Sequence, residues 1–102
     1  MYILAHDLGT SGNKATLFDT SGELVASTTA SYATLYGAGN VAEQNPEDWW
    51  KAIVQTTQTL LKKVPASELA GVALSGQMMG CLCVDKAGRP LRNHMLYCDQ
   101  RS

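Results

Sequence analysis

The sequence has 102 residues, of which 45% are hydrophobic and 17% are charged. This length supports at most one domain, and this composition provides for a core and argues against intrinsic disorder. Eight basic residues face nine acidic ones, so the formal net charge is -1. Proteins that bind nucleic acids by neutralising phosphates are normally basic, so we expect no nucleic-acid partner.

The sequence also argues against membranes and secretion. No apolar run approaches the ~20 residues that cross a bilayer, and the first residues lack the basic and apolar regions of a signal peptide. An odd number of cysteines and the absence of an Asn-x-Ser/Thr acceptor suit a reducing compartment. We therefore predict a cytoplasmic protein without a membrane partner.

The first third of the chain predicts an antiparallel meander. Three strands are expected over residues 2–8, 14–19 and 24–32, because each stretch is apolar or β-branched. A Gly/Thr/Ser turn joins the first two, and Gly22 suits the positive φ of the hairpin between the second and third. Residues 33–44 show no clean periodicity, and the glycine-rich residues 37–40 within them predict a flexible loop.

A helix is predicted to begin at Pro46. Asn45 is a good N-cap, proline fits the first helical position, and Glu47 and Asp48 favour the positive end of the dipole. The residues at three-to-four spacing predict the buried face and are Trp49, Ile53, Thr57, Leu60, Leu61 and Val64. Pro65 ends the helix.

The last third predicts further strands. Residues 69–75 form a small apolar run typical of a strand buried on both faces of a parallel or mixed sheet. Shorter extended segments are expected over residues 81–85 and 95–98. The predicted order is β-β-β-α-β-β, an α/β fold with a mixed sheet in one domain, residues 1–102. His6 is expected to be a hydrogen-bonded interior residue and His94 a loop residue.

The cysteines Cys81, Cys83 and Cys98 do not have the spacing of a zinc or redox motif. We interpret them as small apolar core residues. A redox or metal module that uses them is a minor alternative.

The sharpest motif is the segment from Asp7 to Lys14, where a carboxylate ends a strand and a Gly/Thr/Ser loop leads into the next strand. Gly9 and Gly12 allow a close backbone approach to an anion, and Thr10 and Ser11 add hydroxyl donors. Asp7 suits a hydrated Mg²⁺ beside a phosphate, and Lys14 adds a compact positive charge. The alternative is an ordinary hairpin turn. A Walker A loop is excluded, because that motif leads into a helix whereas this loop leads into a strand.

Two further motifs lie toward the C-terminus of the chain. Gln77, Met78 and Met79 follow the strand expected over residues 69–75, where α/β sheets bind ligands, although methionines more often fill gaps in a core. Asp99 and Arg101 form either an ion pair at a site or a solvated terminal cluster.

Together these motifs resemble the beginning of the FGGY family of carbohydrate kinases, most closely its xylulokinase branch. The resemblance rests on four segments in the family's order, and they are Asp7–Ser11 with Lys14, Glu43–Trp50, Gly76–Gly80 and Leu96–Arg101. It spans the whole chain. Two positions depart from the branch: Met79 stands in place of its histidine, and Tyr97 in place of its tryptophan. Because the histidine helps to hold the ketose, another pentulose, a hexulose or a polyol remains possible.

The resemblance implies an RNase H-like, actin-like subdomain and ATP-dependent phosphoryl transfer to a sugar hydroxyl. It implies that Asp7 holds Mg²⁺, that Gly9, Thr10, Ser11 and Lys14 bind phosphate of ATP, and that Gln77, Met78, Met79 and Asp99 face the sugar. Family members have two lobes and are several times longer, with the general base further along the chain. We therefore expect a fragment that is inactive alone, that needs the remainder of a kinase chain, and that could self-associate. The alternatives are another actin-like ATPase or phosphotransferase, and a stand-alone RNase H-like binding module.

Overall fold

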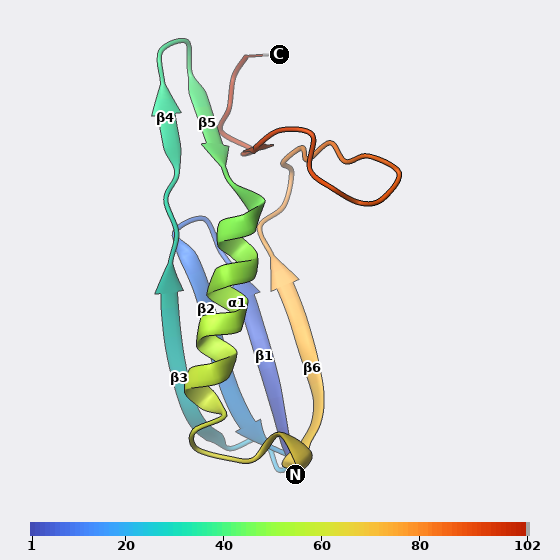
Figure 1. Cartoon of the computed structure of the whole chain (residues 1–102). Coiled ribbons are helices and arrows are strands. Elements are labelled where there is room, and N and C mark those ends of the chain that lie inside the picture. Colours follow the sequence, from blue (N-terminus) through green and yellow to red (C-terminus); the bar gives the residue numbers. More distant parts are fainter. Residues whose placement is uncertain (102) are drawn as a thin grey trace.

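The computed structural model describes residues 1–101, and Ser102, the last residue of the expected domain, lies outside them. A four-stranded sheet carries one long helix on one face, and a small three-stranded sheet continues beyond one end of it (Figure 1). The elements are β1 (Tyr2–Leu8), β2 (Gly12–Asp19), β3 (Leu24–Ser31), β4 (Leu35–Gly37), β5 (Val41–Gln44), α1 (Pro46–Leu60), η1 (Ala66–Glu68), β6 (Leu69–Gly76) and β7 (His94–Met95). In residues 1–101, no helix is long and apolar enough to cross a membrane.

The predicted meander and mixed sheet are confirmed. Strands β1, β2 and β3 pair antiparallel, and β6 pairs parallel with β1 to give the order β3-β2-β1-β6. Gly22 turns the second hairpin with φ +93, as its position predicted. The Asp19 carboxylate supports this turn by accepting the backbone N–H groups of Ser21 and Glu23, each at 3.0 Å.

Helix α1 begins where the sequence predicted. The Asn45 side chain accepts the N–H of Glu47 at 3.0 Å, and Pro46 follows as the first helical residue. Its buried residues are Ala52, Thr56 and Leu60. Trp49, Ile53 and Thr57 of the predicted face are only half-buried. The buried face of the helix is therefore rotated relative to the predicted face. The prediction omitted Ala52 because its side chain is small and Thr56 because it is polar.

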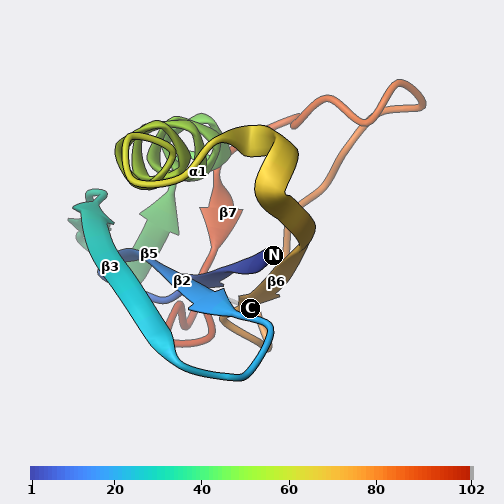
Figure 2. The same ribbon diagram turned by 90° about the horizontal axis from the view of Figure 1, so that it is seen from below.

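The expectation that residues 69–75 form a strand buried on both faces is wrong for this chain. Strand β6 does pair parallel with β1, but Val72 is 58% and Leu74 is 64% exposed. Helix α1 lies over β1, β2 and β3 and leaves β6 uncovered, as the view along the sheet shows (Figure 2). The apolar run therefore predicted the strand and its parallel pairing but not its exposure.

Residues 33–44, which show no clean periodicity, contain the β4–β5 hairpin, and the loop expected at residues 37–40 falls at its turn. Its turn residues Gly39 and Asn40 have φ angles of +77 and +65. These strands are too short for alternation to be recognised in the sequence. The extended segment expected over residues 95–98 begins earlier, because β7 consists of His94–Met95 and pairs with β5.

The prediction of a strand over residues 81–85 is also wrong. Only isolated bridges form there, between Cys81 and Met95 and between Val84 and Pro90. The cysteines are exposed rather than part of the core, and they form no disulfide. The Sγ atoms of Cys81 and Cys83 lie 4.0 Å apart.

His6 is the interior histidine that the sequence predicted, with 3% of its surface exposed. The Asn13 side-chain amide lies 2.9 Å from its Nδ1, and the Thr57 hydroxyl lies 3.2 Å from its Nε2. The same amide donates to the Thr56 hydroxyl at 3.1 Å. This polar network joins β1 and β2 to α1 beside the apolar cluster of Leu4, Ala15, Leu17, Leu60 and Val64.

Gly12 is required by close packing between β2 and β3. A Cβ atom there would stand 2.6 Å from the Ala30 carbonyl oxygen and 3.0 Å from the Ser31 Cα atom. We expect Gly12→Ala to lower the free energy of unfolding by about 1–3 kcal/mol, because backbone atoms must move.

Gly71→Ala is the matched control for this prediction, because a Cβ atom on that β6 residue meets nothing within 4 Å. Urea unfolding of both variants measures the difference. Equal stability of the two alanine variants would contradict the packing explanation.

Candidate functional site: a loop, a hydrogen-bonding glutamine and two cavities

The loop between β1 and β2 lies beside a carboxylate and an ammonium group. Asp7 and Lys14 are opposite each other in the β1–β2 register, and both are exposed. The Ser75 hydroxyl of β6 donates to Asp7 Oδ1 at 3.3 Å. Asp7 and Lys14 border an open cavity of about 350 Å³, which the loop residues Gly9 to Gly12 also line. The structure thus brings all the predicted phosphate-loop residues together.

Hydrogen bonds fix the backbone of this loop. The Gly9 N–H donates to the Gly12 carbonyl at 3.0 Å, and the Tyr32 hydroxyl donates to the Gly9 carbonyl. Burial, with a further contribution from the negative charge of Asp7, raises the pKa of Tyr32 to about 12, so the hydroxyl remains a donor. Within residues 1–101, the N–H groups of Thr10 and Ser11 make no hydrogen bond. The loop therefore presents donors and keeps its acceptors occupied, as an anion site requires.

Gly9 fits the same interpretation. A Cβ atom there would meet only the Gly12 carbonyl oxygen, at 3.5 Å, which is ordinary contact. The fold itself therefore has room for a side chain at this position. A glycine here leaves the cavity side open to a ligand that approaches the backbone closely.

The residues also fit a magnesium ion that is held together with a phosphate. Mg²⁺ is commonly bound by one or two carboxylates, with phosphate oxygens and waters completing its shell. Asp7 supplies one carboxylate beside the loop. Over the described part of the chain, no three His, Cys, Asp or Glu side chains form a metal-binding group. The chain thus suits a shared metal better than a metal held by protein ligands alone.

Gln44 joins this loop to the rest of the site. Its side chain is 1% exposed, and its amide Nε2 donates to the Thr10 carbonyl at 2.6 Å and to the Thr34 hydroxyl at 2.9 Å. Its Oε1 accepts from Trp49 Nε1 at 3.0 Å and from Gln77 Nε2 at 2.8 Å. All the usual hydrogen-bonding capacity of the amide is therefore used. The sequence placed Gln44 within a family motif but did not predict this role.

The residues after β6 differ in their exposure. The Gln77 N–H continues the pairing with β1 by donating to the Leu8 carbonyl at 2.8 Å, and its side chain points to Gln44. Met78 is 78% and Met79 is 87% exposed. The alternative that both methionines fill gaps in the core is therefore wrong within this chain.

An ion-pair cluster holds the C-terminal segment on β5. Arg101 Nη2 lies 2.7 Å from Asp99 Oδ2 and 2.5 Å from Glu43 Oε2, and Arg92 Nη2 lies 2.7 Å from the same Glu43 oxygen. Hydrogen bonds from Arg101, and then from the backbone N–H of Ala42, hold the pKa of Asp99 far below its usual range. The Asp99 side chain is 5% exposed, whereas those of Arg101 and Arg92 are 32% and 48% exposed, so the cluster lies at the surface with only its Asp99 carboxylate covered.

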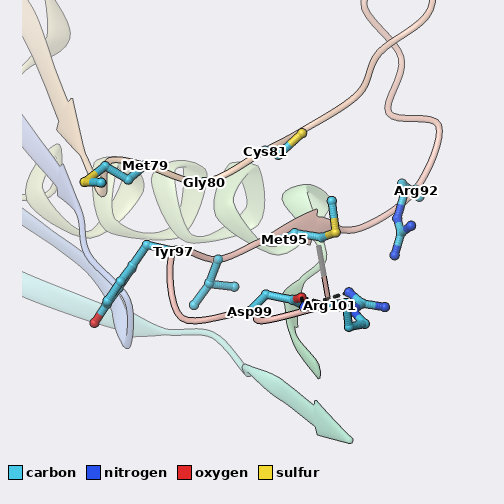
Figure 3. Close-up of a pocket in the computed structure, with 9 residues that line it drawn as sticks. Met79, Gly80, Cys81, Arg92, Met95, Tyr97, Asp99 and Arg101 are labelled. Carbon is cyan, nitrogen blue, oxygen red and sulfur yellow. Dashed lines mark hydrogen bonds and ion pairs between the residues drawn. The ribbon is translucent and has the colours of Figure 1, made fainter. Parts of the chain in front are cut away.

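Two neighbouring cavities lie beside this segment. Met79 and Asp99 line the first, of about 470 Å³, together with Tyr97 and Arg101 (Figure 3). Gln77 and His94 line the second, of about 320 Å³, against the indole of Trp49. His94 was expected in a loop, but it is 7% exposed on β7, and its ring contacts Trp49 edge-on with centroids 4.9 Å apart. No sequence pattern marked it, because its burial arises from the pairing of β7 with β5.

Comparison with known proteins identifies the class. Residues 2–102 match the N-terminal domain of the FGGY family of carbohydrate kinases. The chain is 33% identical over 101 residues to the xylulose kinase of Staphylococcus xylosus, covering 99% of this chain and 21% of that protein. It is 31% identical over 101 residues to a gluconokinase of Bacillus subtilis, with coverages of 99% and 20%. The crystal structure of a xyloylose kinase from Brucella ovis superposes with a TM-score of 0.92 at 34% identity, with coverages of 99% and 22%.

The fold is thus the α/β, actin-like and RNase H-like arrangement that the sequence predicted. The chain belongs to the FGGY family of carbohydrate kinases. It spans about a fifth of the length of the relatives it matches. Those relatives carry the names of different substrates, so membership defines a carbohydrate kinase family and leaves the sugar open.

The role of Gln44 can be tested by a change of a single atom. In Gln44→Glu, an oxygen replaces the Nε2 atom that donates to Thr10 and Thr34. We expect a loss of unfolding free energy of about 1–3 kcal/mol for each of the two donor bonds. Amide exchange at Thr10 and Ser11 should also become faster.

Gln55→Glu on the exposed side of α1 is the control and should change stability little. Urea unfolding and hydrogen exchange measured by NMR report both effects. Unchanged exchange in the loop of Gln44→Glu would contradict the coupling.

The two histidines predict a pH dependence of stability. Burial lowers the pKa of His94 and of His6 below 6.5, although the Asn13 hydrogen bond partly opposes the shift at His6. Below pH ~6.5 the unfolded chain binds protons that the folded chain does not, so stability falls as pH decreases through this value. Thermal unfolding between about pH 7.5 and about pH 5.5 should show this fall, with a shallower slope in His94→Phe. A flat profile would contradict it.

Proposed function

We propose that the chain is the opening part of a kinase lobe that transfers a phosphoryl group from ATP, with Mg²⁺, to a hydroxyl of a pentulose or related sugar. The observation that carries the proposal is the loop from Gly9 to Ser11, whose carbonyls are occupied by Tyr32 and Gln44 and which lines a cavity together with Asp7 and Lys14. Phosphoryl transfer depends on positioning and on charge stabilisation, and these groups can supply both.

Each residue has a separate role in this proposal. Asp7 holds Mg²⁺ through water, and Gly9, Thr10 and Ser11 bind the phosphate through backbone N–H and hydroxyl groups. Lys14 neutralises charge that develops on the phosphoryl oxygens. The Ser75 hydroxyl, at 3.3 Å from Asp7 Oδ1, orients that carboxylate. Magnesium bound in this way would supply electrostatic stabilisation of the transferred group.

We assign sugar binding to the segment after β6 and to Asp99. Gln77 and Met79 line adjoining cavities, Met78 is exposed beside them, and Asp99 lines one cavity together with its ion-pair partner Arg101. The match to a xylulose kinase supports a pentulose, and the match to a gluconokinase shows that the family extends to other acceptors.

The 102-residue chain is proposed to be inactive alone, because the coverage of relatives leaves about four fifths of their length unmatched. Its partner is then the remainder of a kinase chain, and the exposed Val72 and Leu74 on β6 provide an apolar surface for it or for a second copy. The exposed reduced cysteines suit the cytoplasm as the location.

Asp7→Asn tests the metal assignment in a kinase chain of the relatives' length. The change keeps the shape of the side chain and removes its charge. We expect kcat to fall by at least about a hundredfold, since several kcal/mol of charge stabilisation is lost, while sugar affinity changes little.

Glu23→Gln, exposed at the opposite end of the sheet, is the control and should retain full activity. A coupled assay of sugar-dependent ADP release measures both variants. Near-normal turnover of Asp7→Asn would contradict the assignment, and transfer by the 102-residue chain alone would contradict the proposal that it is inactive.

A further inference from the structure

Two thiols lie together at the surface in the segment between β6 and β7. The Sγ atoms of Cys81 and Cys83 are 4.0 Å apart, and both residues are exposed. Cysteine is usually buried where it serves as a small apolar residue. A pair of thiols in contact at the surface therefore indicates a chemical role rather than a packing role.

The backbone holds this pair in place. Residues 81–95, which we call the cysteine hairpin, project away from the four-stranded sheet (Figure 1). Cys81 and Met95 exchange both of their backbone hydrogen bonds, each at 2.9 Å, and the Leu91 N–H donates to the Cys83 carbonyl at 2.9 Å. The positions of the two thiols are thus fixed by pairing across the hairpin.

The same pairing places a third sulfur atom on the side of the thiols. Residues i and i+2 of an extended segment point to the same face, as Cys81 and Cys83 do. Met95 lies directly opposite Cys81, and directly opposed residues also share a face, with Cβ atoms about 4.5–5.5 Å apart. Cys81 and Met95 line one cavity of about 470 Å³ (Figure 3). Two thiols and a thioether therefore share one face of the hairpin.

The distance between the thiols fits a shared cation better than a disulfide. A disulfide bond is about 2.05 Å long, which is about half the distance between these sulfur atoms. Two metal–sulfur bonds of about 2.3 Å at an angle of about 120° span about 4.0 Å. The pair can therefore bind one ion with little movement of either side chain.

The donor atoms select a soft cation. Thiolates and thioethers are the ligands that Cu(I) prefers, whereas structural zinc sites almost always need four ligands, most often Cys and His. Among residues 1–101, no third His, Cys, Asp or Glu completes a metal-binding group with the pair. The additional donor on this face is instead the Met95 thioether, which suits Cu(I).

The charges around the pair also favour a cation over an oxidant. Cys83 raises the pKa of Cys81, first through their hydrogen bond and then through its charge, and it is the thiolate that attacks a disulfide. A bound cation instead displaces both thiol protons to solvent. Cu(I) with two thiolates carries a net charge of minus one, and the positive charge of Arg92, which favours the Cys81 thiolate, stabilises it.

We propose that Cys81 and Cys83, with the Met95 thioether as third ligand, form a chelating site for Cu(I) on the cysteine hairpin. The site shares no residue with the loop from Gly9 to Ser11. It does not depend on the proposed kinase function.

Anaerobic titration of the reduced 102-residue chain tests the site. Tetrakis(acetonitrile)copper(I) supplies the ion, and bathocuproine disulfonate, which is coloured when it holds Cu(I), competes for it. We expect the chain to retain a single ion without a change of elution volume in size-exclusion chromatography. X-ray absorption at the copper edge should show sulfur neighbours only. Zn²⁺ should bind at least about a hundredfold more weakly.

Serine variants separate the ligands. Cys81→Ser and Cys83→Ser each replace a thiol by a hydroxyl of similar shape, and each should lower Cu(I) affinity at least about a hundredfold. Met95→Leu keeps the apolar volume and should lower affinity about tenfold. Cys98→Ser removes the third exposed thiol, which lies outside the hairpin, and as the control should bind normally. Circular dichroism should be unchanged in the serine variants, because all three side chains are exposed.

Four results would overturn the site: full affinity in Cys83→Ser, an equal loss in Cys98→Ser, binding only by a copper-linked dimer, or equal affinity for Zn²⁺. A Cys81–Cys83 disulfide formed by oxidised glutathione, in a chain that retains no Cu(I), would assign the pair to thiol exchange instead. None of these measurements uses phosphoryl transfer, so failure of the proposed kinase function would leave the copper site standing.

Discussion

The side-chain amide of Gln44 holds the site together. It is buried, and it joins four partners that belong to the loop after β1, the segment before β4, helix α1 and the segment after β6. Because an amide has fixed geometry and no charge, it can satisfy donors and acceptors at once without the desolvation cost of an ion. The positions of the phosphate loop and of Gln77 therefore depend on each other.

The sheet supplies the frame for this amide. Antiparallel pairing of β1 with β2 places Asp7 opposite Lys14, and parallel pairing of β1 with β6 places Ser75 beside Asp7. The hairpin of β4 and β5 then carries Gln44 to the end of the sheet, where α1 begins immediately after it. Local interactions fix these elements. Gly22 allows the turn between β2 and β3, Gly12 allows β2 to pack closely on β3, and Asn45 caps the helix.

Much of this frame could be predicted from the sequence. Strong local signals, such as Asn45-Pro46 and the glycine turn at residue 22, gave the meander and the helix start correctly, and the four motifs indicated the family. The features that could not be predicted depend on long-range packing. The burial of His94, the exposure of β6 and of the cysteines, and the small residues on the inner face of α1 all depend on which elements come together.

The central claim is that the loop from Gly9 to Ser11 binds phosphate and that Gln44 couples it to Gln77. Titration of the ¹⁵N-labelled chain with magnesium tripolyphosphate, followed by NMR, tests this most directly. We expect saturable shifts of the Thr10 and Ser11 amides, accompanied by a shift of the Gln77 side-chain amide. Shifts confined to exposed lysines, or equal to those produced by magnesium chloride at the same ionic strength, would contradict it.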